Sequence, residues 1–265
     1  MSLYINTNLA AMGAEGNLVN TDTQLSNAME HLSSGLRINS AADDAAGFTI
    51  SETLQGQANG VSQAQQNTQD GVSLVQTADG SLSEVEQMLQ RIRELAVQYQ
   101  NGTLSSTDQT AIQTEVNQLA SEIERIGETA QFNGIYLLNS AQTITFQVGA
   151  NDGEVIAVST ISLGASVGTF SLGSSNALAS IDAAINAVAG QDDTLGSVQN
   201  RLQYTMQNLS TYEENLTAAN SSIVDVDMAS EMTTFTNLQI LQQAGTAVLA
   251  QANHLPQTLL TLLQG

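Results

Sequence analysis

Histidines, cysteines and lysines carry most of the reactive chemistry in proteins, and this chain has few of them. It has no Cys, which excludes thiolate nucleophiles, thiolate metal sites and disulfides. Its two histidines, His31 and His254, are not part of the His-Glu-x-x-His pattern that a helical zinc-protease site needs. No Lys is present, so a phosphate-binding loop of the GxxxxGK[ST] type is also excluded. The residue counts alone leave a Ser-His-Asp arrangement open.

Asp43 and Asp44 are adjacent carboxylates that would suit a cation. We favour instead a role in the turn that joins two helical segments, with Gly35 and Gly47 supplying backbone freedom. Spacing of acidic residues alone rarely identifies a metal site.

Asp225 and Asp227 resemble the start of a calcium-binding loop. The resemblance fails, because Ala229 and Ser230 stand where a ligand and the invariant glycine belong. The sequence therefore predicts no catalytic centre, no metal site and no cofactor, and we expect a protein that is not an enzyme.

The net charge of −21, from five Arg and 26 acidic residues, limits the partners of this chain. Such a surface repels phosphates and anionic lipid heads, so we expect no nucleic-acid partner and no membrane insertion. The first twenty residues contain neither the basic region nor the apolar run of a signal peptide. If the protein works outside the cell, we expect it to leave without a cleaved signal.

Apolar residues spaced by three and four predict long helices that pack along one stripe, as in coiled coils. The first run comprises Ala78, Leu82, Val85, Leu89, Ile92, Ala96 and Tyr99. The second comprises Ile112, Val116, Leu119, Ile123 and Ile126. A helical segment over ~177–189 precedes the third run, which comprises Leu195, Val198, Leu202, Leu209, Tyr212, Leu216, Ala219, Ile223 and Val226.

The chain between the first two runs predicts an antiparallel helix pair. Asn101-Gly102 is a turn sequence, and Ser106 with Gln109 three residues later fits a capping box. The expected helices are ~72–100 and ~106–130.

The middle of the chain changes to Thr, Val and Ile, which favour strands. Asn133-Gly134 ends the helical region, and 143–149 and 154–163 predict a hairpin around Asn151-Asp152-Gly153. Residues 169–172 are a further candidate strand.

The two ends of the chain carry apolar stripes with unusual surroundings. Residues 232–265 contain no charged side chain, yet glutamines interrupt their apolar residues. A helix too apolar for water and too polar for lipid packs against other helices, and we expect other copies of the chain to supply them. The residues expected to mediate this self-assembly are Leu18, Leu25, Leu32 and Leu36, with Met29 on the same stripe, and Leu238, Leu241, Val248, Leu259 and Leu260.

Several segments closely resemble those of bacterial flagellins. They are INTNLAA (5–11), LSSGLRINSAADDAAGFTIS (32–51), NTQDGVSLVQTADGSLSEVEQMLQRIRELAVQ (67–98), FNGIYLL (132–138) and NLQILQQAGTAVLAQANHLPQTLLTLL (237–263). The resemblance covers roughly residues 1–140 and 196–265.

The resemblance implies a mainly α fold of long antiparallel helices with a small β-hairpin region. Residues 1–44 and 227–265 would pair as the terminal core of a hollow tube, which would bury His31 and His254. Residues 45–226 would form a helical rod with its hairpin at about 143–172, and large outer domains would be missing.

The resemblance also implies a secreted, extracellular subunit of the flagellar filament that serves motility. It would be exported by the flagellar type III secretion system and would polymerise with itself. Further implied partners are flagellar cap and hook-junction proteins and an export chaperone at the C-terminal helix.

Gln90, Arg91, Leu95 and Glu115 match positions that the resemblance implicates in recognition by toll-like receptor five and in subunit packing. The alternative for Arg91 is simple pairing with acidic neighbours. Alternatives for the whole chain are a hook–filament junction protein, which shares the terminal helices, and a host-facing adhesin.

This sequence departs from the family in its charges. Residues 220–222 and the position before Leu238 are neutral, where flagellins usually carry Arg or Lys. With so many uncompensated acidic groups per subunit, we expect assembly to need more salt than usual.

Overall fold

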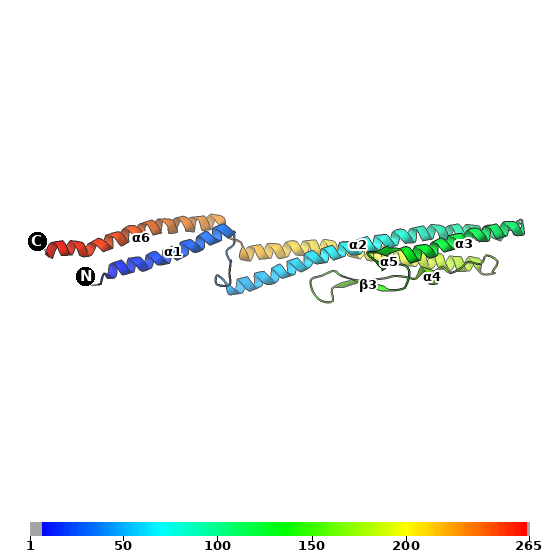
Figure 1. Cartoon of the computed structure of the whole chain (residues 1–265), viewed down its shortest axis with the longest axis horizontal. Coiled ribbons are helices and arrows are strands. Elements are labelled where there is room, and N and C mark those ends of the chain that lie inside the picture. The colour runs from blue at the N-terminus through cyan, green and yellow to red at the C-terminus, as the bar shows by residue number, and fades with distance from the viewer. Residues whose placement is uncertain (1–6, 264–265) are drawn as a thin grey trace. The chain divides into compact units, whose positions relative to one another are not determined.

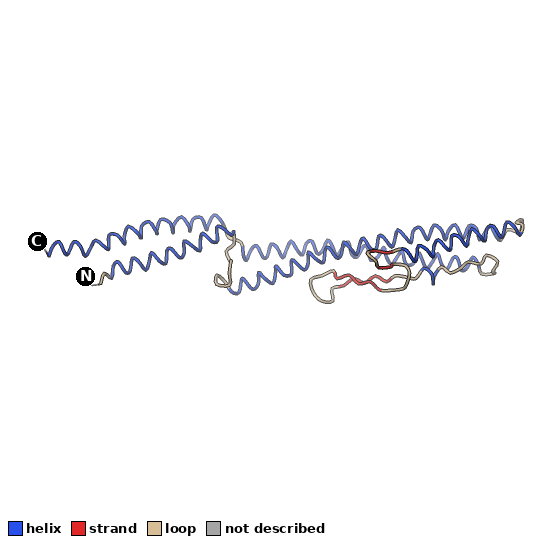
Figure 2. Tube along the Cα trace, viewed as in Figure 1, coloured by secondary structure: helices blue, strands red, loops and turns tan. Residues whose placement is uncertain are grey.

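The protein is mainly helical, with two small antiparallel sheets (Figures 1 and 2). The computed structural model describes the backbone of residues 7–263 and the side chains of residues 7–164 and 167–254. The helices are α1 (Leu9–Ser34), α2 (Ala45–Tyr99), α3 (Ser106–Thr129), α4 (Leu163–Ser166), α5 (Ala177–Val224) and α6 (Met228–Leu263). The strands are β1 (Gln131–Phe132), β2 (Ile135–Tyr136), β3 (Thr143–Gln147) and β4 (Val155–Ser159). The predicted fold class is confirmed.

The chain forms two compact units. Met1–Gly56 and Leu216–Gly265 make up the terminal unit, and Gln57–Asn215 makes up the central unit. The units divide within α2 and α5, whereas the predicted borders, 44/45 and 226/227, lie at the junctions between helices.

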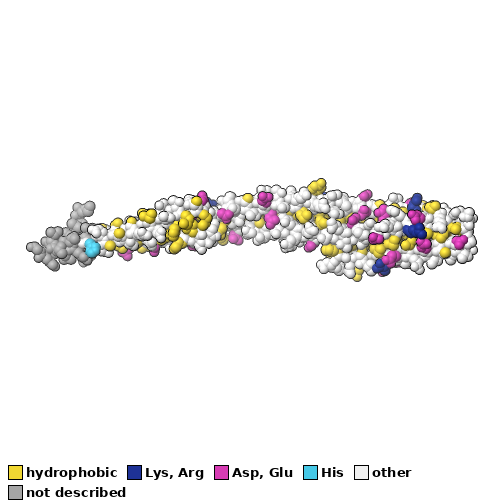
Figure 3. Space-filling model, turned by 90° about the horizontal axis from the view of Figure 1, so that it is seen from above, with side chains coloured by type: hydrophobic (Ala, Val, Ile, Leu, Met, Phe, Trp, Pro, Cys, Tyr) yellow, Lys and Arg dark blue, Asp and Glu magenta, His cyan; other side chains and the backbone are white. Residues whose placement is uncertain are grey.

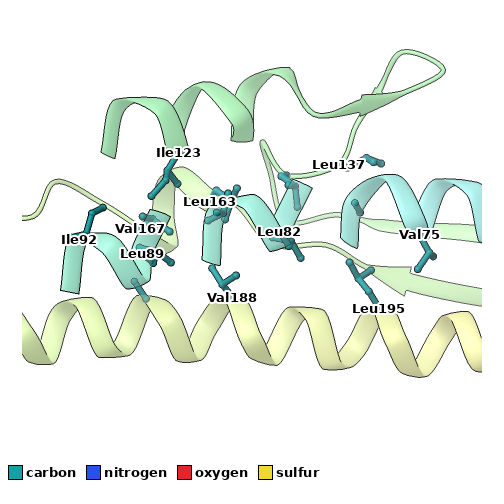
Figure 4. Packing of buried hydrophobic residues seen from close by; sticks show 14 of the residues in the cluster. Val75, Leu82, Leu89, Ile92, Ile123, Leu137, Leu163, Val167, Val188 and Leu195 are labelled. Atoms are coloured by element: carbon teal, nitrogen blue, oxygen red, sulfur yellow. The ribbon is translucent and has the colours of Figure 1, made fainter. Parts of the chain in front are cut away.

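The first two predicted runs and the start of the third, Leu195, Val198 and Leu202, build the core of the central unit. Tyr212 of the third run is 42% exposed, and its residues from Leu216 onward belong to the terminal unit. Leu82, Leu89 and Ile92 of α2 are no more than 1% exposed and contact residues of α3 and α5. Figure 4 shows Leu89 and Ile92 beside Ile123 of α3 and close to Val188 of α5. A core without Trp is thus made from Leu, Ile and Val at helical spacing.

Helix α2 begins at Ala45, far before the predicted start near residue 72. Val61, Ala64, Thr68 and Gly71 continue the buried stripe at the same spacing, but three of them are too small or polar to give an apolar pattern. The buried Thr68 hydroxyl donates to the Ala64 carbonyl at 2.7 Å, so its polar group is satisfied inside the helix.

The capping box of α3 lies one residue earlier than predicted. Ser105, in an extended conformation, accepts a hydrogen bond from the Asp108 N–H, and the Asp108 carboxylate accepts from the Ser105 N–H at 3.1 Å. The prediction from Ser106 and Gln109 was wrong because aspartate, although shorter than the usual Glu or Gln, reaches the Ser105 backbone. Hydrogen bonds from Ser105 lower the pKa of Asp108.

The β-hairpin is present but shorter than predicted. β3 pairs with β4 from Thr143↔Ser159 to Gln147↔Val155, and Gly153 in the connecting loop has a φ of 85°. Asn133 and Gly134 both have positive φ and close the β1–β2 hairpin, as a two-residue turn requires.

Residues 169–172 form no strand, contrary to the prediction, because a side chain satisfies their backbone. The Gln113 amide donates to the Phe170 carbonyl at 2.8 Å and accepts from the Leu172 N–H at 2.9 Å. These two bonds are those that a neighbouring strand would make.

Candidate functional site

Helices α1 and α6 lie side by side in the terminal unit (Figure 1). Their shared apolar core is small: Leu25, Ala28 and Leu238 are buried, and Phe235 is half-buried against them. A Cβ at Gly245 of α6 would stand 3.2 Å from Leu18 Cδ1, so the glycine allows a close approach of α1.

Among the described side chains, polar contacts also join α1 to α6. Asn8 Nδ2 donates to the Ala252 carbonyl at 2.8 Å, and Gln242 Nε2 donates to Asp22 Oδ1 at 2.7 Å. His31 Nδ1 lies 3.4 Å from Glu231 Oε1, with both side chains about one-fifth exposed. His31 thus contacts the partner helix within the chain.

Large apolar side chains remain exposed on this helix pair, and we call them the terminal apolar surface. On the face drawn in Figure 3, hydrophobic side chains lie exposed along the α1–α6 pair. The surface comprises Leu9, Met12, Val19, Met29, Met228, Met232, Ile240, Leu241 and Val248, each 47–65% exposed. The pair therefore buries only part of its own apolar surface.

The predicted self-assembly residues fall into three groups. Leu25 and Leu238 are buried between the helices of one chain, Leu18 and Leu32 are half-buried, and Leu241 and Val248 are 56% and 59% exposed. The side chains of Leu259 and Leu260 lie outside the described residues.

Leu36 is not on α1, so the prediction that it extends the helical stripe was wrong. Gly35 ends α1 with a left-handed φ of 75°, and Leu36 instead forms a β-bridge with Asp225. The predicted turn follows, in which Asp43 Oδ2 accepts from the backbone of Ser40 and Asn39 at 2.9 and 3.0 Å. These bonds lower the pKa of Asp43.

Asp44 caps the start of α2 through Oδ1, which accepts from the N–H groups of Ala46 and Gly47 at 3.0 Å. Gly47 is needed for space rather than for an unusual φ, because a Cβ there would stand 2.7 Å from Ile38 Cδ1. Asp227 caps α6 in the same way, accepting from Ala229 N at 3.0 Å. One carboxylate of each pair therefore caps a helix, whereas Asp43 holds the turn before α2 and Asp225 accepts from the Ser221 hydroxyl at the end of α5.

Arg37 ties the end of α5 to the segment after α1, a role the sequence analysis missed. Its N–H donates to the Val224 carbonyl and its Nη2 to the Ile223 carbonyl, both at 2.6 Å. A helix C-terminus attracts cations because its last carbonyls have no helical donor. The signal available in the sequence was that Arg37 is the only arginine before Arg91.

Gln90, Arg91 and Glu115 lie exposed on neighbouring turns of α2 and α3, and we call them, with Glu94, the Arg91 surface. Arg91 Nη2 donates to Glu115 Oε1 and Arg91 Nη1 to Glu94 Oε2, each at 3.1 Å. These hydrogen bonds raise the pKa of Arg91, so its charge is permanent. The arginine crosses from α2 to α3 and presents a fixed polar pattern.

Leu95 is only 2% exposed and faces the core of the central unit. It lies beneath the Arg91 surface and can support it, but its side chain is not available to a partner of the folded unit. Sequence matching placed it with the other three, because matching does not distinguish the two faces of a helix.

Asp79 of α2 and Asp192 of α5 form a carboxyl pair in the central unit. A hydrogen bond with Asp79 and partial burial raise the pKa of Asp192 to about 6, with further repulsion from Glu86 and Asp193. A carboxyl whose pKa is raised by folding stabilises the fold at low pH, and that contribution is lost as pH rises from about 4 to about 6. At neutral pH the ionised Asp192 therefore opposes folding.

Among the described residues, no group of three or more His, Cys, Asp or Glu side chains is placed to hold a metal ion. The same part of the chain contains no helix long and apolar enough to cross a membrane.

Two family models cover most of the chain. Residues 5–143 match the bacterial flagellin N-terminal helical region, and residues 178–263 match the bacterial flagellin C-terminal helical region.

Relatives match over nearly the whole length. A flagellin of Halalkalibacterium halodurans is 49% identical over 273 aligned residues, which cover 99% of this chain and 100% of the relative. A flagellar filament 33 kDa core protein of Treponema phagedenis is 42% identical over 286 aligned residues, with 99% and 100% covered.

The crystal structure of Bacillus cereus flagellin is similar at a TM-score of 0.51 and 31% identity, covering 58% of this chain and 94% of that chain. The helical ends, the central hairpin and the family models at both ends agree, and the chain belongs to the bacterial flagellin family.

Proposed function

We propose that this chain is a structural subunit, not an enzyme, that polymerises with itself into a hollow flagellar filament. The observation that carries the proposal is the terminal apolar surface, nine large apolar side chains exposed on α1 and α6. Family membership supports the same role.

Exposure of the terminal apolar surface to water is unfavourable in free energy for the single chain. Each large side chain contributes roughly 1.5–3 kcal/mol when it is fully buried. Exposed apolar patches of this kind mark protein interfaces, and α6 carries no charged side chain from residue 232 onward that would oppose helix packing. Other copies supply matching helices, because every copy carries the same surface.

Electrostatics oppose this assembly. Each subunit has a net charge of −21, and like charges repeated along a polymer repel one another. Salt screens that repulsion, since the Debye length falls from about 30 Å at 0.01 M to a few ångströms near 1 M. The polymer is therefore expected to form more readily at high salt.

Negative-stain electron microscopy of the purified chain, with a seed added, tests both points. Long tubes are expected, with much more polymer at about 500 mM than at about 10 mM salt. Equal polymer at both concentrations contradicts the electrostatic argument. Monomers or short caps at every salt concentration contradict the filament role and favour the hook–filament junction protein.

We also propose that the Arg91 surface contacts toll-like receptor five. Gln90, Arg91 and Glu115 are exposed together, and arginines held in a fixed geometry are common centres of binding energy. Arg91→Ala is expected to weaken activation of a receptor reporter by about tenfold. Arg125→Ala removes a similar exposed arginine paired within α3 and serves as the matched control. An equal response of both variants contradicts the assignment.

Family membership supports the remaining parts of the proposal. These are export by the flagellar type III secretion system, an extracellular place in the flagellum, a role in motility, and contacts with cap proteins, hook-junction proteins and a chaperone at α6. Retention of the chain inside cells that lack this secretion system tests the export route. The adhesin alternative requires an exposed additional domain, and residues 160–176, where one would be inserted, are a short connection packed on the central unit.

A further inference from the structure

Pro256 removes a backbone hydrogen bond from the C-terminal part of α6. Proline has no backbone N–H, so inside a helix the carbonyl four residues earlier loses its donor. α6 continues past Pro256 to Leu263, and the carbonyl concerned is that of Ala252. Ala252 is only 6% exposed, and a shielded backbone carbonyl without a partner is unfavourable.

The side chain of Asn8 supplies the missing donor. Asn8 Nδ2 donates to Ala252 O at 2.8 Å, while Asn8 Oδ1 accepts from Ala11 N at 3.1 Å and caps α1. A primary amide offers a donor and an acceptor on one planar group, which an ionised aspartate does not. The Asn8 side chain thus caps the N-terminus of α1 and also supplies the hydrogen-bond donor that Ala252 O lacks within α6.

We propose that Asn8 is a positioning residue that fixes the axial register of the N-terminal end of α1 against the C-terminal part of α6, by binding the carbonyl that Pro256 frees. The chain has one proline, so this type of carbonyl occurs once along α6 and marks one position. The inference deepens the proposed filament role and rests on it, because register decides where the terminal apolar surface is presented.

The Leu36–Asp225 β-bridge and the 3.4 Å contact between His31 and Glu231 fix register where α1 ends and α6 begins. Between that end and Asn8, the other contacts specify register weakly. Leu25, Ala28 and Leu238 make apolar contacts, which have no direction, and Gly245 only permits a close approach. The Gln242–Asp22 hydrogen bond lies at exposed positions, where water competes. The Asn8 bond is directional and sits against a buried residue.

A double-mutant cycle tests the assignment with four full-length chains: the unsubstituted chain, Asn8→Ser, Pro256→Ala and both substitutions together. Serine is about as good as asparagine at capping a helix, so Asn8→Ser chiefly removes the donor to α6. Pro256→Ala restores an N–H at position 256, which can then bond Ala252 O itself. Any cost to the α1 cap is the same in both backgrounds and cancels in the cycle.

Hydrogen exchange of the α6 amides around residues 245–255 is measured on the free chains and on any pelleted polymer. Asn8→Ser alone is expected to speed exchange about fivefold, the effect of losing one ordinary hydrogen bond, and less than about twofold in the Pro256→Ala background. Asn20→Ser, at an exposed position of α1, is the matched control and should show no dependence on Pro256→Ala.

If Asn8→Ser speeds hydrogen exchange equally with Pro256 and with Pro256→Ala, Asn8 acts only through the α1 cap. If it speeds exchange in neither background, the Asn8 bond to α6 is not formed. Each result overturns the proposal. Electron microscopy of the same chains is a separate check: absence of tubes from the unsubstituted chain contradicts the filament role, and the exchange comparison does not depend on it.

Discussion

Removal of residues 232–265 is expected to abolish tube formation at every salt concentration. The truncation deletes nearly all of α6 and with it Leu238, which forms the small core with Leu25 and Ala28. α1 then has no partner helix, and the terminal apolar surface loses Met232, Ile240, Leu241 and Val248. Electron microscopy and sedimentation of the truncated and full chains under matched conditions measure the effect.

The folding of the central unit is the control that distinguishes a loss of assembly from a loss of folding in the truncated chain. The central unit lies within residues 57–215, so its helical circular dichroism and cooperative thermal transition should survive the truncation. Tubes formed by the truncated chain would contradict the role of α6.

A single substitution sharpens the same comparison. Leu241→Lys places a charge on a side chain that is 56% exposed, so it should leave the single chain folded and block packing between copies. Leu241→Met keeps an apolar side chain of similar volume and should assemble normally.

The central unit was predictable because its core is made from large apolar residues at regular spacing. Leu82, Val85, Leu89 and Ile92 need only the helical period to place them on one face, and all four are buried. The same period continues through Val61, Ala64 and Thr68, but small and polar residues concealed it. The apolar spacing therefore predicted the second half of α2 and missed the first half.

Features that depend on contacts between distant segments could not be predicted from local patterns. The Gln113 side chain makes the backbone hydrogen bonds of residues 170 and 172 that a neighbouring strand would make. Arg37 donates to a carbonyl at the C-terminus of α5. In both cases the bonded residues are far apart in the sequence. The Asn8–Ala252 bond is of the same kind, since it joins opposite ends of the chain. Pro256 was visible in the sequence, but its consequence appears only when α1 lies beside α6.

The candidate site was predicted in outline from composition. The absence of charge after residue 231 predicted packing against other helices, and the exposed Leu241 and Val248 are compatible with that expectation. Which stripe residues face α1 and which remain exposed could not be derived, because an α6 that is apolar on several sides has no single preferred face. Leu95 illustrates the same difficulty in the central unit.

Leu89→Ala is expected to destabilise the central unit by about 3 kcal/mol, the typical cost of truncating a fully buried leucine. Leu89 is 0% exposed and lies where α2 meets α3 and α5, as Figure 4 shows, so the cavity cannot be filled by movement of one helix alone. In a unit of this size the change corresponds to a fall in Tm of roughly 6–12 °C.

Thermal and urea unfolding of the full-length chain, followed by circular dichroism, measure the effect of Leu89→Ala. Val97→Ala is the matched control, because Val97 lies two turns further along α2, is 53% exposed, and should cost less than about 0.5 kcal/mol when truncated. Similar losses for the two variants would mean that the stripe is not the stabilising core. A large loss for Leu89→Ala alone would show that the central unit is held together by the apolar period, independently of any partner subunit.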